Sequence, residues 1–158
     1  MFIKYLLVFL ISMVPLIELR GAVPYAFAFG IPLVPAYTLC ILGNMLPVPF
    51  IFFFARKTLE WGKDKPVIGK FFTWCLKKGE SGGKKLEATA GKGLYVALLL
   101  FVGIPLPGTG AWTGTLAASF LNMDFKKSIV AVMGGVVLAG IIMGLVSAGA
   151  LSVLSGIF

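Results

Sequence analysis

Apolar residues fill most of this chain in long blocks, and short groups of proline, glycine and charged residues separate the blocks. Residues 2–17 are apolar but shorter than the roughly 20 residues that a helix needs to cross a bilayer. Helix-breaking residues follow between Pro15 and Pro24, and a second short apolar piece runs from Tyr25 to Ile31. This order predicts a re-entrant hairpin, which enters and leaves the membrane on one side. Ordinary helices kinked by proline are the alternative.

The next apolar block, residues 36–54, is long enough for a complete transmembrane helix. Pro47 and Pro49 are expected to bend it. Asn44 places a polar amide inside this span. Its side chain either bonds to a neighbouring helix or satisfies the carbonyl groups that the two prolines leave free.

The second half of the chain repeats this order. Residues 93–122 are apolar but are interrupted between Gly103 and Gly114, and a continuous apolar block follows from Ile129 to Leu151. Lysines lie on both sides of residues 93–122, and positive charge marks the cytoplasmic side of a membrane. The pattern therefore predicts a second re-entrant hairpin followed by a second span.

A hairpin and a span occur twice, in opposite directions, so we expect an all-α integral membrane protein built as an inverted repeat. Gly21-Ala22 resembles Gly110-Ala111, and Gly43-Asn44 resembles Gly134-Gly135, which agrees with a repeat. The whole chain, residues 1–158, is expected to form a single membrane domain. Its parts are residues 1–54 (first hairpin and span), 55–93 (basic loop) and 94–158 (second hairpin and span).

The composition supports a membrane protein: 59% of the residues are hydrophobic, 13% are charged, and the mean hydropathy is +1.00. Soluble domains are closer to half apolar and a quarter charged. Ten of the fourteen lysines and arginines lie in residues 56–92. The positive-inside rule places this loop in the cytoplasm of a multi-pass plasma-membrane protein, and we expect no nucleic-acid partner.

Within the basic loop, apolar residues from Val67 to Leu76 recur at helical spacing, with Trp61 and Trp74 close by. This pattern predicts an amphipathic helix lying in the cytoplasmic membrane interface. A helix that binds a soluble partner is the alternative. The residues from Glu80 to Lys85 are expected to form a flexible turn.

Glu18 and Arg20 are the only charged residues between Lys4 and Arg56. Charges at membrane depth are costly and usually face protein or a water-filled cavity, so the two tips are expected to meet around them near the bilayer midplane. Burial favours a neutral acid that carries a proton or binds a cation, whereas a neighbouring Arg20 favours a carboxylate paired as a gate. A purely structural pair is the third reading. The candidate substrate- or proton-binding residues are Glu18, Arg20, Gly21, Asn44, Pro105, Pro107, Gly108, Thr109, Gly110, Trp112 and Thr113.

Enzymatic chemistry is not indicated. The chain has no histidine, and its two cysteines, Cys40 and Cys75, belong to no cluster with metal-ligand spacing. Glu18 is the only acid in the apolar blocks, and no nucleophile is paired with a base. We therefore expect no catalysis, no metal, no cofactor and no disulfide.

Three segments carry a family resemblance: Pro15 to Pro24 with its acid, Gly43-Asn44 with the aromatic run ending at Arg56, and residues 101–114, Phe-Val-Gly-Ile-Pro-Leu-Pro-Gly-Thr-Gly-Ala-Trp-Thr-Gly. They resemble the small multidrug export protein family, which is in turn similar to the DedA membrane-protein superfamily. The resemblance extends over roughly residues 10–145.

The resemblance implies two facing re-entrant hairpins and a transport role that depends on protons or membrane potential. It also implies amphipathic or cationic small molecules, or lipid-linked phosphates, as substrates. DedA proteins place arginines around the second tip, but this chain has none there, which leaves Arg20 to supply a cation. Membrane lipids and a second copy of the chain are the expected partners. A non-transporting scaffold or lipid-organising factor is the alternative function.

Overall fold

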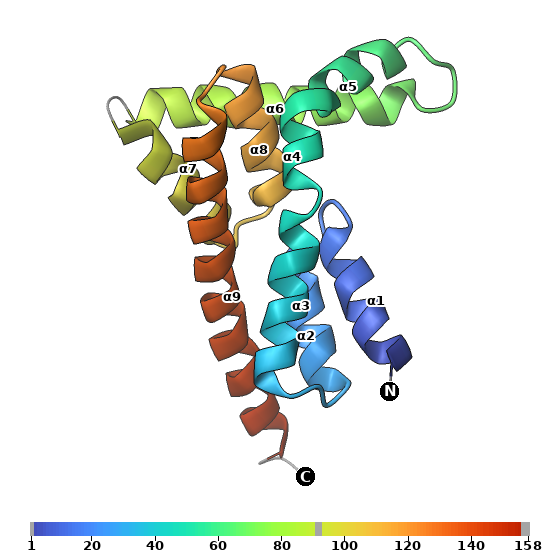
Figure 1. Cartoon of the computed structure of the whole chain (residues 1–158), viewed down its shortest axis with the longest axis vertical. Helices are drawn as coiled ribbons and strands as arrows, with labels where there is room; N and C mark the ends of the chain where they lie inside the picture. Colours follow the sequence, from blue (N-terminus) through green and yellow to red (C-terminus); the bar gives the residue numbers. More distant parts are fainter. Residues whose placement is uncertain (1, 91–92, 156–158) are drawn as a thin grey trace.

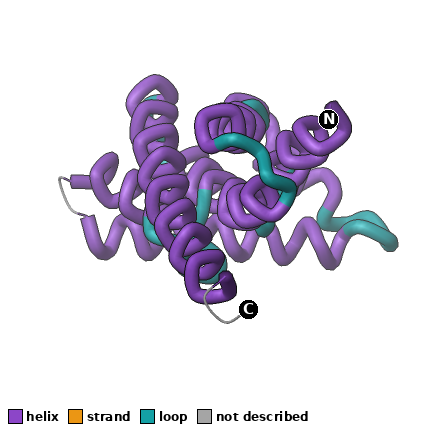
Figure 2. Tube along the Cα trace, turned by 90° about the horizontal axis from the view of Figure 1, so that it is seen from below, coloured by secondary structure: helices purple, strands orange, loops and turns teal. Residues whose placement is uncertain are grey.

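The computed structural model describes residues 2–90 and 93–155 (Figure 1), and every regular element within them is helical. No strand occurs in these ranges, and Figure 2 shows the helices from below, joined by short loops. The elements are α1 (Phe2–Met13), α2 (Glu18–Ala28), α3 (Leu33–Met45), α4 (Val48–Phe50), the π-helix η1 (Ile51–Ala55), α5 (Arg56–Gly62), α6 (Gly69–Ala90), α7 (Leu94–Gly103), α8 (Ala111–Phe120) and α9 (Phe125–Ser155).

Two helical hairpins organise the bundle. Helices α1 and α2 form the first, with its tip at residues 14–17, and α7 and α8 form the second, with its tip at residues 104–110. Figure 1 shows the hairpins extending from opposite ends of the bundle along α9, so that their tips meet beside the middle of that helix. The predicted all-helical architecture is confirmed, and the chain contains two helical hairpins.

The non-helical segment at the tip of the first hairpin is shorter than the sequence predicted. Leu16 and Glu18 have φ values of 77° and 51°, and this left-handed backbone reverses the chain within a few residues. Helix α2 then continues through Gly21 and Pro24, so the expectation of broken backbone throughout Pro15 to Pro24 was wrong. A proline inside a helix removes one backbone hydrogen bond, and tertiary contacts of the buried face of α2 offset that loss.

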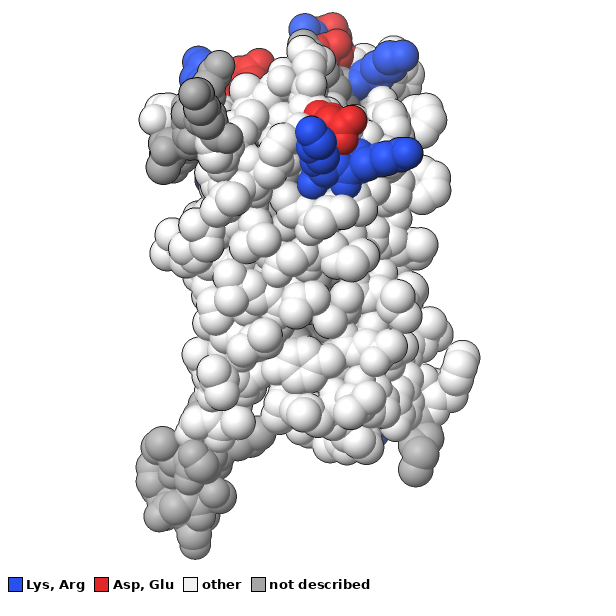
Figure 3. Space-filling model, turned by 60° about the vertical axis from the view of Figure 1, so that its left-hand side comes forward, with Lys and Arg blue, Asp and Glu red and all other residues white. Residues whose placement is uncertain are grey.

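Two continuous helical segments, Leu33–Ala55 and Phe125–Gly149, are long and apolar enough to cross a membrane. The first is not regular, because α3 ends at Met45 and the chain resumes as α4 and the π-helix. The interruption falls at Pro47, as the two prolines in this segment predicted. Figure 3 shows charged side chains gathered at one end of the molecule, whereas the middle of that face carries none.

Helix α6 is much longer than the predicted amphipathic segment. It has 22 residues and lies across one end of the bundle (Figure 1). The expected flexible turn from Glu80 to Lys85 was wrong, because these residues are helical. Gly79 packs closely on Phe120 of α8, and Gly82 faces Ala117. Glycine disfavours an isolated helix by about 1 kcal/mol relative to alanine, and here the close packing that glycine permits stabilises the helix.

Each long helix packs against its own hairpin through a glycine at a matching place. A methyl group built on Gly43 of α3 would lie 2.6 Å from the carbonyl oxygen of Phe9, four residues before the end of α1. A methyl group on Gly135 of α9 would lie 2.6 Å from the carbonyl oxygen of Leu99, four residues before the end of α7. The two halves therefore share a packing relationship as well as an order of elements.

The Gly140–Gly144 pair on α9 also has a role within the chain. The hydroxyl group of Tyr37 in α3 donates a hydrogen bond to the carbonyl oxygen of Gly140 at 2.9 Å, and Gly144 packs directly on the same ring. This pair of small residues lets α3 approach α9 closely.

Candidate functional site between the hairpin tips

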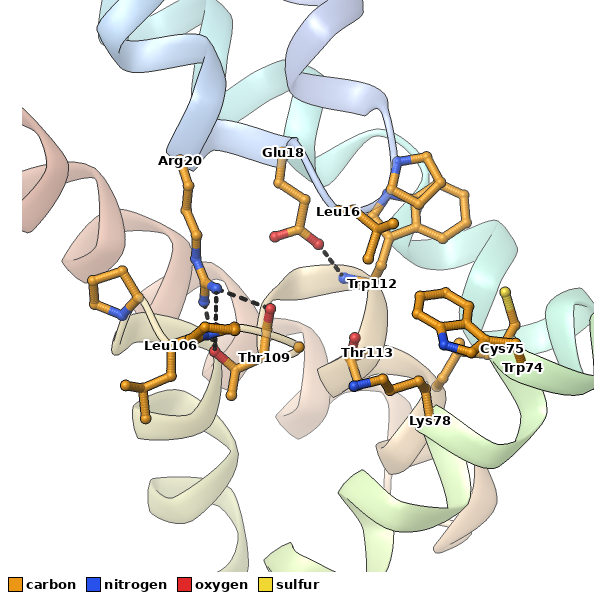
Figure 4. Close-up of a pocket in the computed structure, with 15 residues that line it drawn as sticks. Leu16, Glu18, Arg20, Trp74, Cys75, Lys78, Leu106, Thr109, Trp112 and Thr113 are labelled. Carbon is orange, nitrogen blue, oxygen red and sulfur yellow. Dashed lines mark hydrogen bonds between the residues drawn. The ribbon is translucent and has the colours of Figure 1, made fainter. Parts of the chain in front are cut away.

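Glu18 binds the N-terminus of α8. Its side chain is only 4% exposed, and it accepts hydrogen bonds from the backbone N–H groups of Ala111 (3.2 Å) and Trp112 (2.9 Å), as Figure 4 shows for Trp112. These are the first two residues of α8, where N–H groups have no partner within the helix. A carboxylate is favourable at this end because the helix dipole is positive there.

Arg20 binds the tip that follows α7. Its guanidinium group points toward this tip in Figure 4 and donates to backbone and side-chain oxygens. The acceptors are the carbonyl oxygens of Val102 (3.1 Å), Ile104 (3.2 Å), Leu106 (2.7 Å) and Thr109 (3.0 Å) and the Thr109 hydroxyl group (2.9 Å). A cation is favourable where helix carbonyl groups are left unpaired.

The two charged residues therefore bind the two helix ends that meet at the tip of the second hairpin. Glu18 accepts hydrogen bonds from the N–H groups at the start of α8, and Arg20 donates hydrogen bonds to the carbonyl groups at the end of α7. The direct pairing of Glu18 with Arg20 considered from the sequence is replaced by this arrangement: these two described side chains make no ion pair, and each is satisfied by the opposite hairpin. Residues two apart on a helix face different directions, which explains why each reaches a different helix end.

A cavity of about 250 Å³ lies beside this contact. Most of the candidate residues line it, namely Glu18, Arg20, Pro105, Pro107, Gly108, Thr109, Trp112 and Thr113. Gly110 lies next to the cavity wall, where its Cα approaches the Glu18 carboxylate so closely that an added methyl group would overlap Oε2.

Two candidate residues lie elsewhere. Gly21 is inside α2 and packs on Ile17 of the same hairpin. Asn44 is 3% exposed in α3 and lines neither of the two cavities, and its Oδ1 atom has no hydrogen-bond partner among the described residues. The structure therefore does not bring Gly21 or Asn44 to the cavity.

Helix α6 contributes three residues that sequence reasoning missed: Trp74, Cys75 and Lys78. The Nζ atom of Lys78 lies over the second tip, 2.8 Å from where a methyl group on Gly108 would be, and 5.8 Å from the ring centre of Trp74. Arg20 is thus not the only cation available to the tips. The helical spacing of these residues was visible in the sequence, but nothing there indicated that this face of α6 covers the hairpin tips.

A second cavity of about 550 Å³ adjoins the first and is lined mainly by apolar and aromatic side chains from residues 46–59 and from α6. Four residues, Pro15, Cys75, Trp112 and Leu116, line both cavities. In the described part of the chain, no three His, Cys, Asp or Glu side chains are grouped so that they could hold a metal ion. The arrangement can bind a molecule that has one polar end and an apolar body.

Comparisons with known proteins bear on this site. Neither the curated proteins nor the solved structures gave a match. One family model matches residues 18–142, which is well over half of the chain and includes Glu18, Arg20 and the second hairpin tip. The chain therefore belongs to the family described as "putative small multi-drug export protein".

Proposed function

We propose that this protein is a small multi-pass transporter of the cell membrane that exports amphipathic molecules, drug-like or lipid, through the site between the hairpin tips. The family assignment and the two long apolar helices identify a membrane protein. The observation that carries the proposal is that Glu18 and Arg20 of one hairpin hold the two broken helix ends of the other. Interrupted helices that meet between two halves of a bundle are typical of secondary transporters.

The proposal includes a topology in which both hairpins are re-entrant, from opposite sides of the membrane, and the two halves form an inverted repeat. The matching contacts of Gly43 and Gly135 support the repeat. The uncharged middle of the face in Figure 3 supports a position within lipid. In this topology, residues 56–92 and the start of α9 lie in the cytoplasm, because positive charge is retained on that side.

Cysteine labelling tests this topology. In a chain with Cys75→Ser, single cysteines introduced at Lys57 and Lys126 are both expected to react with an impermeant maleimide only from the cytoplasmic side. Native Cys40 is buried and is expected to stay unlabelled. Labelling of the two positions from opposite sides would eliminate the second re-entrant hairpin.

Coupling is proposed to act through Glu18. Protonation would remove the charge that makes its carboxylate a strong acceptor for the N–H groups of Ala111 and Trp112. The hydrogen bonds between Glu18 and the start of α8 would weaken, and the two tips could separate to open the cavity. Proton binding and tip separation would thereby be linked, which is what a proton- or potential-coupled transporter requires.

Replacing Glu18 by glutamine is therefore expected to abolish proton-driven flux in proteoliposomes, because a neutral amide binds the N–H groups of α8 weakly at every pH and cannot respond to a proton gradient. Flux would be measured under an imposed pH gradient. Glu80→Gln, the same chemical change on an exposed position of α6, is the matched control and should transport like the unmodified protein. Unchanged proton-driven flux in Glu18→Gln would refute the coupling role.

A scaffold or lipid-organising factor is the second candidate function, favoured by the fact that Glu18 and Arg20 both stabilise the fold through backbone contacts. Such a protein would bind lipid but would show no flux in the same proteoliposomes.

A second copy of the chain is proposed to complete the transport pathway, since the bundle exposes many large apolar side chains. Cross-linking in membranes would test for this homodimer.

A further inference from the structure

We infer that the cavity between the tips selects amphiphiles that carry an acidic head group, and that Lys78 of α6 is the residue that binds this group. The inference rests on the proposed function, because it names the substrate class of the same site. It differs from an expectation of cationic substrates, which the multidrug label suggests.

The charged side chains around the cavity differ in whether their hydrogen-bonding atoms remain free to bind a ligand. Glu18 is occupied by two backbone N–H groups, and Arg20 by the carbonyl groups of the second tip. Lys78, in contrast, has no hydrogen bond or ion pair to any described residue, and its ammonium group lies over the Trp74 ring and beside Gly108 of the second tip. An ammonium group has three donors. The charge that the cavity offers to a ligand is therefore positive.

The surroundings of Lys78 leave room for a head group. Gly108 has φ of +80°, and the absence of a side chain there lets the ammonium group sit directly over the tip. Thr113 lines the same cavity with its hydroxyl group (Figure 4). A carboxylate or phosphate in this position could accept hydrogen bonds from both side chains, and such charge-assisted bonds are stronger than neutral ones.

The adjoining apolar cavity fits the body of the same ligand. Its volume of about 550 Å³ lies within the range of roughly 300–1,000 Å³ that is usual for small-molecule sites. Phe71 and Phe72 of α6 and Phe50 and Phe54 of the first long segment supply aromatic surface. Because the two cavities share a wall that includes Trp112, one molecule can place its head group near Lys78 and its tail in the apolar cavity.

The position of α6 agrees with this orientation. The helix lies across the charged end of the bundle (Figures 1 and 3), where lysine and tryptophan side chains are typical of a membrane interface. A head group at Lys78 would lie at interface level, and the tail would extend toward the apolar part of the bundle. A cationic head group in the same place would be repelled.

Three probes that have similar alkyl tails and different head groups test the inference: dodecanoate, dodecyl phosphate and dodecyltrimethylammonium. Binding to the protein in nanodiscs would be followed by intrinsic tryptophan fluorescence, with empty nanodiscs as the reference, because Trp74 and Trp112 both line the cavity. At least one acid is expected to bind about tenfold more tightly than the ammonium probe, and Lys78→Gln is expected to lower acid affinity by about tenfold. Lys78→Arg should retain acid binding, and Lys84→Gln, on an exposed part of α6, should change nothing.

The ratio of dodecanoate to dodecyl phosphate affinity identifies which acid the site prefers, and either preference supports the inference. Equal affinity for the ammonium probe, absence of binding by all three probes, or unchanged acid affinity in a monodisperse Lys78→Gln protein would overturn it. Acid binding that depends on Lys78 without any flux in proteoliposomes would overturn the transport proposal and support the assignment of Lys78.

Discussion

Gly110→Ala is expected to destabilise the protein by about 3–5 kcal/mol. Gly110 has φ of +136°, in a region of backbone space that is essentially restricted to glycine, and forcing another residue there costs about 1–3 kcal/mol. The added methyl group would also overlap Oε2 of Glu18 and lie 2.9 Å from Oε1. The carboxylate would have to move, and the two bonds to α8 would be lost.

Two further measurements distinguish backbone strain at Gly110 from displacement of the Glu18 carboxylate. Gly30 also has a positive φ, of +68°, but nothing lies within 4 Å of an added methyl group, so Gly30→Ala measures backbone strain alone and is expected to cost about 1 kcal/mol. In a Glu18→Ala background, Gly110→Ala should cost less than in the natural chain, because no carboxylate remains to be displaced. Thermal unfolding in detergent would be measured for the natural chain, Gly30→Ala, Gly110→Ala, Glu18→Ala and the Glu18→Ala/Gly110→Ala double variant. Equal destabilisation by Gly30→Ala and Gly110→Ala would contradict the contact with Glu18.

Replacing Arg20 by alanine is expected to cost about 3 kcal/mol, because hydrogen bonds from a charged donor contribute about 1.5–3 kcal/mol each and are not additive within one group. The change would remove the Arg20 donor from the carbonyl groups of Val102 and Thr109, and it would remove one of several donors from those of Ile104 and Leu106. The melting temperature in detergent should fall by roughly 6–12 °C for a chain of this size. The second tip is also expected to become accessible to proteases.

Arg20→Lys should recover only part of this stability, since an ammonium group cannot reproduce the planar fork of a guanidinium group. Lys4→Ala is the matched control: Lys4 is an exposed basic residue of the same hairpin and donates a single bond to the Phe29 carbonyl oxygen at 3.3 Å. It is expected to change the melting temperature by less than about 2 °C. A similar melting temperature for Arg20→Ala and Lys4→Ala would show that Arg20 does not hold the tip.

These two predictions concern the same physical feature. A helical hairpin in an apolar environment leaves carbonyl groups unpaired at the end of its first helix and N–H groups unpaired at the start of its second, and both must be satisfied. Glu18 and Arg20 satisfy one end each. Under the proposed transport function, the stability of the fold and the opening of the cavity would both depend on the contact between Glu18 and α8.

The positions of the interruptions could be predicted from the sequence because proline, glycine and charge are local signals. The second tip was expected between Gly103 and Gly114 and is found at residues 104–110. The first was expected to extend to Pro24, but helix α2 begins at Glu18. The difference arises because proline and glycine lower helix propensity without forbidding a helix that packs well on one face.

The sequence by itself determined the apolar blocks, the two hairpins, the long helices and the presence of a rare acid and a rare arginine at the first tip, because these depend on composition and on spacing along the chain. Only the tertiary structure decided what those two charges bind, and that α6 brings Lys78 and Trp74 over the second tip. Hydrogen-bond partners 80 or more residues apart depend on how hairpins and α6 are docked. Docking is set by packing at positions such as Gly43, Gly82 and Gly135, whose neighbours are not specified by local sequence.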